Sequence, residues 1–305
     1  MTHYYSLNEY CRSEFGCKLY KLSLDAGLTC PNRDGTKGTP GCVFCSDEGT
    51  GEFSEKLCSD MNSQIENAKK RVEHKNKNGK YIAYFQSFTN TYGPVEYLEK
   101  IFTGAIKHPD VAVLSVATRP DCLGEDVLSL LEKLNRIKPV WVELGFQTSK
   151  EDSVRYIGRG YENSVFTKAV SDLGRIGIKT VAHIILGLPG ETEEDMKNSV
   201  RFVCEAGIWG IKLHLLHVLR GTRLAQDYEN GCFECFSQDE YLSTVCSVLE
   251  IIEPDKVIHR LTGDGDKRKL IAPMWSANKK AVLNSLNAML DEKGIVQGAG
   301  LKAEY

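Results

Sequence analysis

Three cysteines lie close together in one segment rich in glycine and proline, and their spacing is typical of a metal site. Cys30, Cys42 and Cys45 are separated by eleven and by two residues, directly after an apolar run that we expect to be a strand. The chain holds eleven cysteines in all. Because disulfides are rare in a reducing compartment, clustered thiols there more often bind metal or take part in catalysis. These three thiols are therefore the candidate metal ligands.

The number of thiols separates two kinds of metal site. A structural zinc ion takes four protein ligands, so a zinc site here would need Cys58 or a histidine to complete it. Three thiolates instead leave one iron of a four-iron cluster without a protein ligand, and that iron can bind a substrate or cofactor. Phe44, between the last two cysteines, would shield one side of such a cluster. We favour the four-iron cluster and keep the zinc site as the alternative.

Apolar runs of strand length alternate with helical segments along most of the chain. The runs are rich in Val, Ile, Leu and Tyr, as is typical of parallel strands buried on both faces. They span 18–27, 81–87, 111–119, 140–148, 180–189 and 211–219. The stripe of Phe166, Val170 and Leu173 predicts a helix that ends before Gly177, and Thr192 is a candidate N-cap of the next helix. The alternation predicts βα units and a parallel sheet.

Six convincing strands are too few for a closed eight-stranded barrel, so we predict an α/β fold of the partial (β/α)6 TIM-like barrel type. Residues 1–17 are expected to form an N-terminal helical segment, and 18–223 the barrel with its cluster loop at 30–45. Residues 224–305 are expected to form a helical extension packed on the barrel. In barrels of this kind the chemistry collects at the C-terminal ends of the strands. The candidate site residues at those ends are Gln86, Ser87, Thr118, Arg119, Glu143, Gln147, Gly187 and His217.

The composition is that of a globular protein without a membrane span. A net charge of −3 excludes a wholly basic nucleic-acid binder, although it permits a local basic face. No apolar run approaches the roughly 20 residues that cross a bilayer. The first residues contain neither the basic nor the apolar region of a secretion signal. We therefore expect a cytoplasmic protein with no membrane partner.

The cysteine segment resembles the cluster loop of the radical S-adenosylmethionine (SAM) superfamily. That loop is usually C-x3-C-x2-C with an aromatic residue before the last cysteine, so Phe44 and Cys45 fit while the eleven-residue first spacing departs. The string at 30–45 is similar to that of the YhcC/YtqA-like group, which is related to the radical enzyme subunit of Elongator. Further similar strings are FQSFTNTYGP (85–94), ATRPDCL (117–123), VELGFQT (142–148), GRGY (158–161), HIILGLPGET (183–192), KLHLLHVLRGT (212–222) and HRLTGDGDKRKLIAP (259–273).

The resemblance implies an enzyme that holds a [4Fe–4S] cluster and SAM. One electron, from a low-potential donor such as flavodoxin or ferredoxin, would cleave SAM to a 5′-deoxyadenosyl radical that attacks the substrate. The resemblance also implies a contact with SAM for each of seven residues. Gln86 and Ser87 would contact the amino group of SAM, and Arg159 its carboxylate. Thr118, Glu143 and Gln147 would line its ribose and methionine, and the backbone at Gly187 would approach its adenine. Taken without their context, Glu143 and Arg159 would pass for an ordinary ion pair.

The kinship with Elongator implies an RNA substrate and suggests a tRNA wobble uridine. The competing function is that of a non-catalytic zinc or iron–sulfur protein acting as a scaffold or sensor. Basic residues interleave with Gly and Asp in the 259–273 segment, which could hold a phosphate, line the substrate mouth or be a simple turn. Cys232 and Cys235 form a second C-x2-C, but no further thiols lie near them in the sequence, so we expect packing rather than a second cluster.

Overall fold

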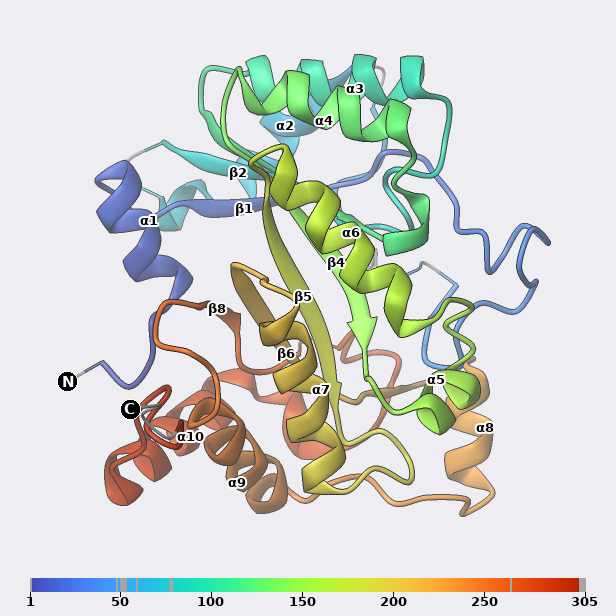
Figure 1. Ribbon diagram of the computed structural model, residues 1–305, viewed down its shortest axis with the longest axis vertical. Coiled ribbons are helices and arrows are strands. Elements are labelled where there is room, and N and C mark those ends of the chain that lie inside the picture. Colours follow the sequence, from blue (N-terminus) through green and yellow to red (C-terminus); the bar gives the residue numbers. More distant parts are fainter. Residues whose placement is uncertain are drawn as a thin grey trace.

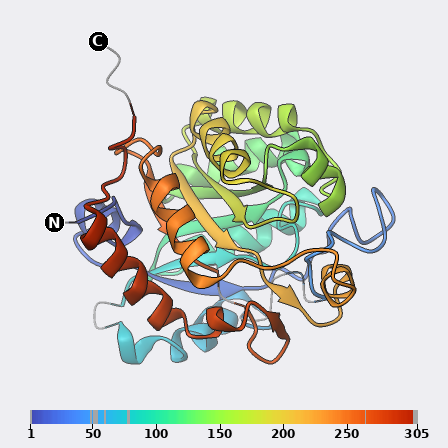
Figure 2. The ribbon, with the colours of Figure 1, turned by 90° about the horizontal axis from the view of Figure 1, so that it is seen from below.

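A computed structural model of the chain describes residues 2–47, 49, 54–58, 60–76, 79–263 and 265–301. Within these residues, seven parallel strands form one sheet in the order β1-β2-β3-β4-β5-β6-β8. The sheet curls into a half-barrel with helices on its outer face (Figures 1 and 2). The strands are β1 (Tyr20–Leu24), β2 (Tyr81–Phe85), β3 (Val111–Thr118), β4 (Val140–Gln147), β5 (Lys179–Leu186), β6 (Gly210–Leu215) and β8 (Val257–Arg260).

The helices that follow the strands pack their apolar stripes on the outer face of the sheet. Helix α6 ends two residues before Gly177, whose φ of +71° favours glycine, and α7 begins with a capping box between Thr192 and Asp195. The end of α6 before Gly177 and the N-cap at Thr192 were predicted from the sequence, and the structure adds the reciprocal bond from Asp195. The helices are α1 (Leu7–Phe15), α2 (Met61–Lys70), α3 (Val95–Lys107), α4 (Glu125–Asn135), α5 (Glu151–Ile157), α6 (Asn163–Arg175), α7 (Glu193–Glu205), α8 (Arg223–Glu229), α9 (Gln238–Leu249) and α10 (Lys279–Lys293).

The two faces of the sheet differ in chemistry. Because side chains alternate along a strand, residues such as Val142 and Leu144 of β4 point outward into the main apolar core under the helices. Glu143 and Gln147, on the opposite face of the same strand, line a cavity on the inner side. Lys212 and His214 of β6 repeat the pattern. The inner face of the half-barrel is therefore the polar one.

The predicted fold class is confirmed, and each of the six predicted segments contains a strand. The structure adds β8, which belongs to the segment that we expected to be helical and pairs with β6. The segment 224–305 also contributes β9 (Leu270–Ala272), which pairs antiparallel with β7 (Val218–Leu219). Strand β8 has the sequence VIHR, and a run of two apolar residues is too short for a periodicity to reveal it. The predicted boundary between 223 and 224 stays a prediction.

Residues near both ends of the chain cover the outer edge of β8. The backbone N–H of Ile258 donates to the carbonyl of Tyr5 (2.8 Å), and the N–H of Gln297 donates to the carbonyl of His3 (2.9 Å). The side chain of Gln297 accepts from the N–H of Tyr5 (2.8 Å). The last strand of the sheet is thus held between β6 and residues 3–6.

In the described part of the chain, no helix combines the length and the apolar character that crossing a bilayer requires.

Candidate active site

A cavity of about 830 Å³ opens on the inner face of the half-barrel, toward the C-terminal ends of the strands. Its wall includes all three candidate metal ligands, Cys30, Cys42 and Cys45. Five of the seven residues predicted to contact SAM also line it, namely Gln86, Thr118, Glu143, Gln147 and Arg159. The structure therefore brings together the cysteine loop and the polar ends of β2, β3 and β4, as the sequence predicted.

The cysteine loop is held in place by hydrogen bonds that leave its thiols facing the cavity. Val43 donates its N–H to the carbonyl of Ile157 (3.1 Å) and accepts from the N–H of Leu224 (3.0 Å), which joins the loop to α5 and α8. Asn32 donates from Nδ2 to the carbonyl of Gly158 (2.8 Å), and Arg33 donates to the carbonyl of Cys45 (3.2 Å). The loop is thus fixed both through the backbone of Val43 and through the side chains of Asn32 and Arg33.

The three thiols fit a cluster better than a single zinc ion. A zinc ion with Zn–S bonds of about 2.3 Å would hold three sulfurs about 3.8 Å apart. Among the described residues, the ligand atoms of Cys30, Cys42 and Cys45 do not all lie within 4.8 Å of one another. Cys58, the alternative fourth ligand, instead donates to the carbonyl of Lys56 and accepts from Asn67. The wider spread leaves room for a group of several atoms.

Of the two thiols of the C-x2-C motif, that of Cys42 is prepared for deprotonation, whereas its hydrogen bond to Cys42 and burial raise the pKa of Cys45. A hydrogen bond from the Cys45 thiol, more than the one from Asn32 Nδ2, lowers the pKa of Cys42 to about 7. Burial alone would raise it. The thiolate is the form that binds metal, so this environment suits a metal ligand.

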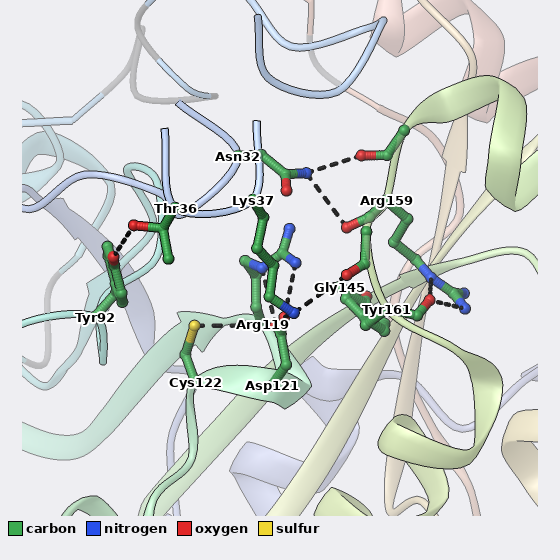
Figure 3. A network of polar contacts seen from close by, with 12 residues as sticks. Asn32, Thr36, Lys37, Tyr92, Arg119, Asp121, Cys122, Gly145, Arg159 and Tyr161 are labelled. Atoms are coloured by element: carbon green, nitrogen blue, oxygen red, sulfur yellow. Dashed lines mark hydrogen bonds and ion pairs between the residues drawn. The ribbon is translucent and has the colours of Figure 1, made fainter. Parts of the chain in front are cut away.

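The long spacer between the first two cysteines is anchored by a network centred on Asp121 (Figure 3). Its carboxylate accepts from Arg119 Nε and Nη2, both at 2.9 Å, and from Lys37 Nζ at 2.6 Å. Thr36 and Tyr92 share a second bond of 2.9 Å between their hydroxyls. Burial acts to raise the pKa of Asp121, but the bonds from Arg119 and Lys37 bring it below its ordinary value. The spacer is therefore tied to the end of β3.

Arg159 has a different surrounding from the one predicted. Its guanidinium is buried and donates to the carbonyls of Phe146 (2.8 Å), Thr148 (2.9 Å) and Tyr161 (2.9 and 3.1 Å). The remaining N–H donates to Oδ1 of Asn163 (2.8 Å). These bonds use all five donors of the side chain. Arg159 therefore holds the turn after β4 with all its donors bonded, and its predicted contact with the SAM carboxylate stays a prediction.

Glu143 lies at the floor of the cavity inside a buried ionic network. Its Oε1 accepts from Lys21 Nζ (2.9 Å) and Ser115 Oγ (2.8 Å), while Oε2 accepts from His183 Nε2 (2.8 Å) and Lys212 Nζ. Burial favours the neutral carboxyl, yet the two lysines hold the pKa of Glu143 well below its ordinary range. Burial, with Lys212 nearby, lowers the pKa of His183 to about 4. Glu143 is therefore ionised and His183 neutral at pH 7.

Two predicted contact residues lie outside the cavity lining. Ser87 is buried and donates to Oγ of Ser54 (3.0 Å). Gly187 has a φ of +87°, and a Cβ there would stand 3.1 Å from the ring of Phe236. The positive φ and the nearby Phe236 ring both favour glycine at this turn, and the predicted approach of its backbone to adenine stays a prediction.

Several lining residues were missed by sequence reasoning as members of the site. They are Arg33, Tyr84 and Lys212. Tyr84 and Lys212 stand on the inner face of β2 and β6, so counting by twos from a known inner residue of each strand would have found them. Arg260, in the basic 259–273 segment, lines the cavity, which was one of the roles expected of that segment. Arg33 lies in the cysteine loop itself.

Comparisons with known proteins match most of the chain. A model of the radical SAM superfamily matches residues 30–203, and a Radical_SAM C-terminal domain matches 208–292. The protein YtqA of Bacillus subtilis is 45% identical over 97% of this chain and 92% of its own length. The tRNA uridine(34) acetyltransferase of Methanocaldococcus jannaschii is 27% identical over 46% of this chain and 26% of its own length. The structure of Methanocaldococcus infernus Elp3 superimposes with a TM-score of 0.67 at 16% identity, covering 92% of this chain and 64% of that one.

Proposed function

Because the chain belongs to the radical SAM superfamily, we propose that Cys30, Cys42 and Cys45 hold its [4Fe–4S] cluster and that SAM binds beside it in the cavity. Members of the superfamily are enzymes that use both cofactors. The bound cluster supplies the electron that cleaves SAM to a 5′-deoxyadenosyl radical. The observation that carries the proposal is the meeting of three loop thiols with the polar ends of β2, β3 and β4 around one cavity.

Different residues of the cavity wall would bind different parts of SAM. Gln86, Thr118 and Gln147 offer neutral donors and acceptors to the amino group and the ribose. Arg119 takes the carboxylate in place of Arg159, because Asp121 holds its Nε and Nη2 while no hydrogen bond from its Nη1 exists in the described structure. Tyr161 supports both guanidiniums, which lie 5.0 and 4.4 Å from the centre of its ring.

The substrate that we propose is an RNA, with tRNA as the first candidate. Support comes from the relative that is a tRNA uridine(34) acetyltransferase and from the fold shared with Elp3. A low-potential donor such as flavodoxin or ferredoxin would deliver the electron. All eleven cysteines are unpaired, which supports a reducing, cytosolic location.

Two units divide this work. Residues 18–223 would form most of the catalytic barrel, and residues 224–305 an extension that also supplies β8 to the sheet. The two family models, which meet between residues 203 and 208, support a division of this kind.

The decisive experiment is anaerobic. The protein is reconstituted with iron and sulfide, SAM and dithionite are added, and 5′-deoxyadenosine is quantified by chromatography. We expect the nucleoside from the wild type and none from Cys45→Ala. Cys232→Ala, an exposed thiol of the other C-x2-C motif, is the matched control and should retain both iron and cleavage. Full cleavage by Cys45→Ala would overturn the ligand assignment, and bound zinc in place of iron would favour the scaffold or sensor.

The RNA substrate is tested by binding of bulk tRNA across a salt series. Phosphate contacts release counterions, so the logarithm of the affinity should fall linearly with the logarithm of the salt concentration. Absence of binding at low salt would remove RNA from consideration and leave the radical chemistry untouched.

A further inference from the structure

The cavity wall is strongly cationic although the chain as a whole is acidic. The chain carries a net charge of −3. Among the described lining residues, however, seven cationic side chains face two carboxylates. The cations are Arg33, Arg119, Arg159, Lys212, Arg260, Lys267 and Arg268, and the carboxylates are Glu143 and Asp266. A concave surface lined by one sign of charge focuses the field and attracts ligands of the opposite sign.

The two cofactors leave this excess in place. A cluster held by three thiolates is anionic and SAM is cationic, so their charges offset each other. Arg33, Arg119 and Arg159 belong to the half of the wall that holds the cysteine loop and the turn after β4. The other four cations come from β6, from β8 and from the loop after β8, and of these Lys212 contacts Glu143.

The β6–β8 part of the wall places like charges next to each other. Lys212 of β6 and Arg260 of β8 are direct register partners in the sheet, and like charges opposite each other on paired strands are destabilising. Glu143 and the Tyr84 hydroxyl bind Lys212 Nζ from the other side. His214, on the same face as Lys212, also lines the cavity. Its Nε2 is buried and has no hydrogen-bond partner among the described residues. A buried polar nitrogen without a partner is costly, so an added acceptor would relieve it.

The loop after β8 is drawn over the same space by two glycines. A Cβ on Gly263 would lie 2.8 Å from the His217 ring, and one on Gly265 would lie 3.2 Å from it. Any side chain at Gly263 would push the loop away from the ring. The close approach brings the exposed Lys267 and Arg268 to the border of the cavity. Asp266 pairs with Arg268 (2.9 Å), and Asp264 lies outside the described residues.

We propose that Lys212, His214 and Arg260 form a subsite for a phosphate group of the substrate, with Lys267 at its rim. The inference rests on the proposed function, because it assigns the substrate half of the same cavity. A phosphate offers several acceptor oxygens and more than one charge, which matches three converging donors better than a carboxylate does. The substrate is then a nucleotide, either free or within RNA, whose phosphate is fixed on β6 and β8 while its reactive carbon faces SAM.

The test is ligand binding to the reconstituted enzyme with SAM and without reductant, measured by titration calorimetry. The probes are uridine 5′-monophosphate, uridine and an anticodon stem-loop RNA. We expect the monophosphate or the stem-loop to bind, and Arg260→Gln to weaken that binding about tenfold to a hundredfold, the range of a charge-assisted hydrogen bond. Arg260→Lys keeps the charge and should lose less. Arg136→Gln removes an exposed arginine of α4 and should change nothing.

The pattern of binding identifies the source of the phosphate. Tight binding of the monophosphate over uridine points to a free nucleotide, whereas binding of the stem-loop alone points to an internal phosphate. The subsite would be overturned if Arg260→Gln and Arg136→Gln lost equal binding affinity. It would also be overturned if the monophosphate and uridine bound equally well and Arg260→Gln left RNA binding unchanged. Arg260→Lys that binds no better than Arg260→Gln would also count against it. Formation of 5′-deoxyadenosine by the wild type, assayed separately, reports on the proposed function itself.

Discussion

Two regions of the cavity satisfy their polar groups in opposite ways. They are the loop end, formed by the cysteine loop and Arg119, and the floor, formed by Glu143 and its partners. At the loop end, the backbone of the cysteine loop is hydrogen-bonded to α5 and α8, and its three thiols line the cavity together with Arg119. At the floor, Glu143 receives four donors from the protein itself. The loop end is therefore where the proposed cluster would bind, whereas the charges of the floor are paired within the protein.

Removal of iron should abolish the function of the loop end without unfolding the protein. We expect chelation to abolish SAM cleavage completely while the protein keeps its helical circular dichroism and a cooperative unfolding transition, because hydrogen bonds rather than metal fix the loop. Zinc-finger-like domains, by contrast, unfold without their metal. Loss of the cooperative transition on chelation would show that the loop end depends on its cofactor for folding.

Loss of the negative charge of Glu143 should destabilise the floor of the cavity. Glu143 is fully buried (0% exposed), and Glu143→Gln would leave Lys21 and Lys212 without their shared anion. Removal of one partner from a buried ion pair costs about 3–5 kcal/mol, so we expect the free energy of unfolding in urea to fall by that amount. The exposed Glu132→Gln should change it by less than about 0.5 kcal/mol. Equal small changes in both variants would contradict the comparison.

Acid should weaken the floor through His183. Its pKa in the folded protein, about 4, lies below the ordinary 6.5, so the unfolded chain binds more protons between these values. Stability from this group is present above pH 6.5 and is lost as the pH falls toward 4, with a slope of at most about 1.4 kcal/mol per pH unit. We expect His183→Gln to flatten the curve in this window. The exposed His74→Gln should leave the curve as it is, and a steep acid limb that survives in His183→Gln would assign it to other groups.

A smaller effect should come from the anchor of the spacer. Asp121→Asn keeps the shape but removes the charge that holds Arg119 and Lys37 (Figure 3). We expect a loss of about 1–3 kcal/mol in stability together with weaker SAM binding, since Arg119 would lose its orientation. Asp126→Asn, near the start of α4, is the control. If Asp121→Asn bound SAM with unchanged affinity, the proposed contact between Arg119 and SAM would be wrong.

Sequence patterns predicted what depends on local chemistry. The six strands were visible because each is a long apolar run, and the loop was visible because cysteine spacing is a covalent property of the chain. The surroundings of Arg159 were not visible, because its acceptors are carbonyls of Phe146, Thr148 and Tyr161 that only the folded turn brings together. Lys212 was hidden for a similar reason: a lysine in an apolar strand reveals its direction only when Glu143 and Tyr84 stand opposite.

The position of β8 late in the chain bears on the order in which the parts of the sheet can assemble during translation. A nascent chain emerges from the ribosome with Cys30 to Cys45 early and with residues 257–260 late. Until β8 arrives, the edge of β6 has no neighbour, and until Gln297 follows, the contacts from His3 and Tyr5 that cover β8 are incomplete. The cysteine loop is thus made while one side of the half-barrel still lies open. Arg260 of the cavity wall, on β8, is thus synthesised well after the cysteine loop that shares the cavity with it.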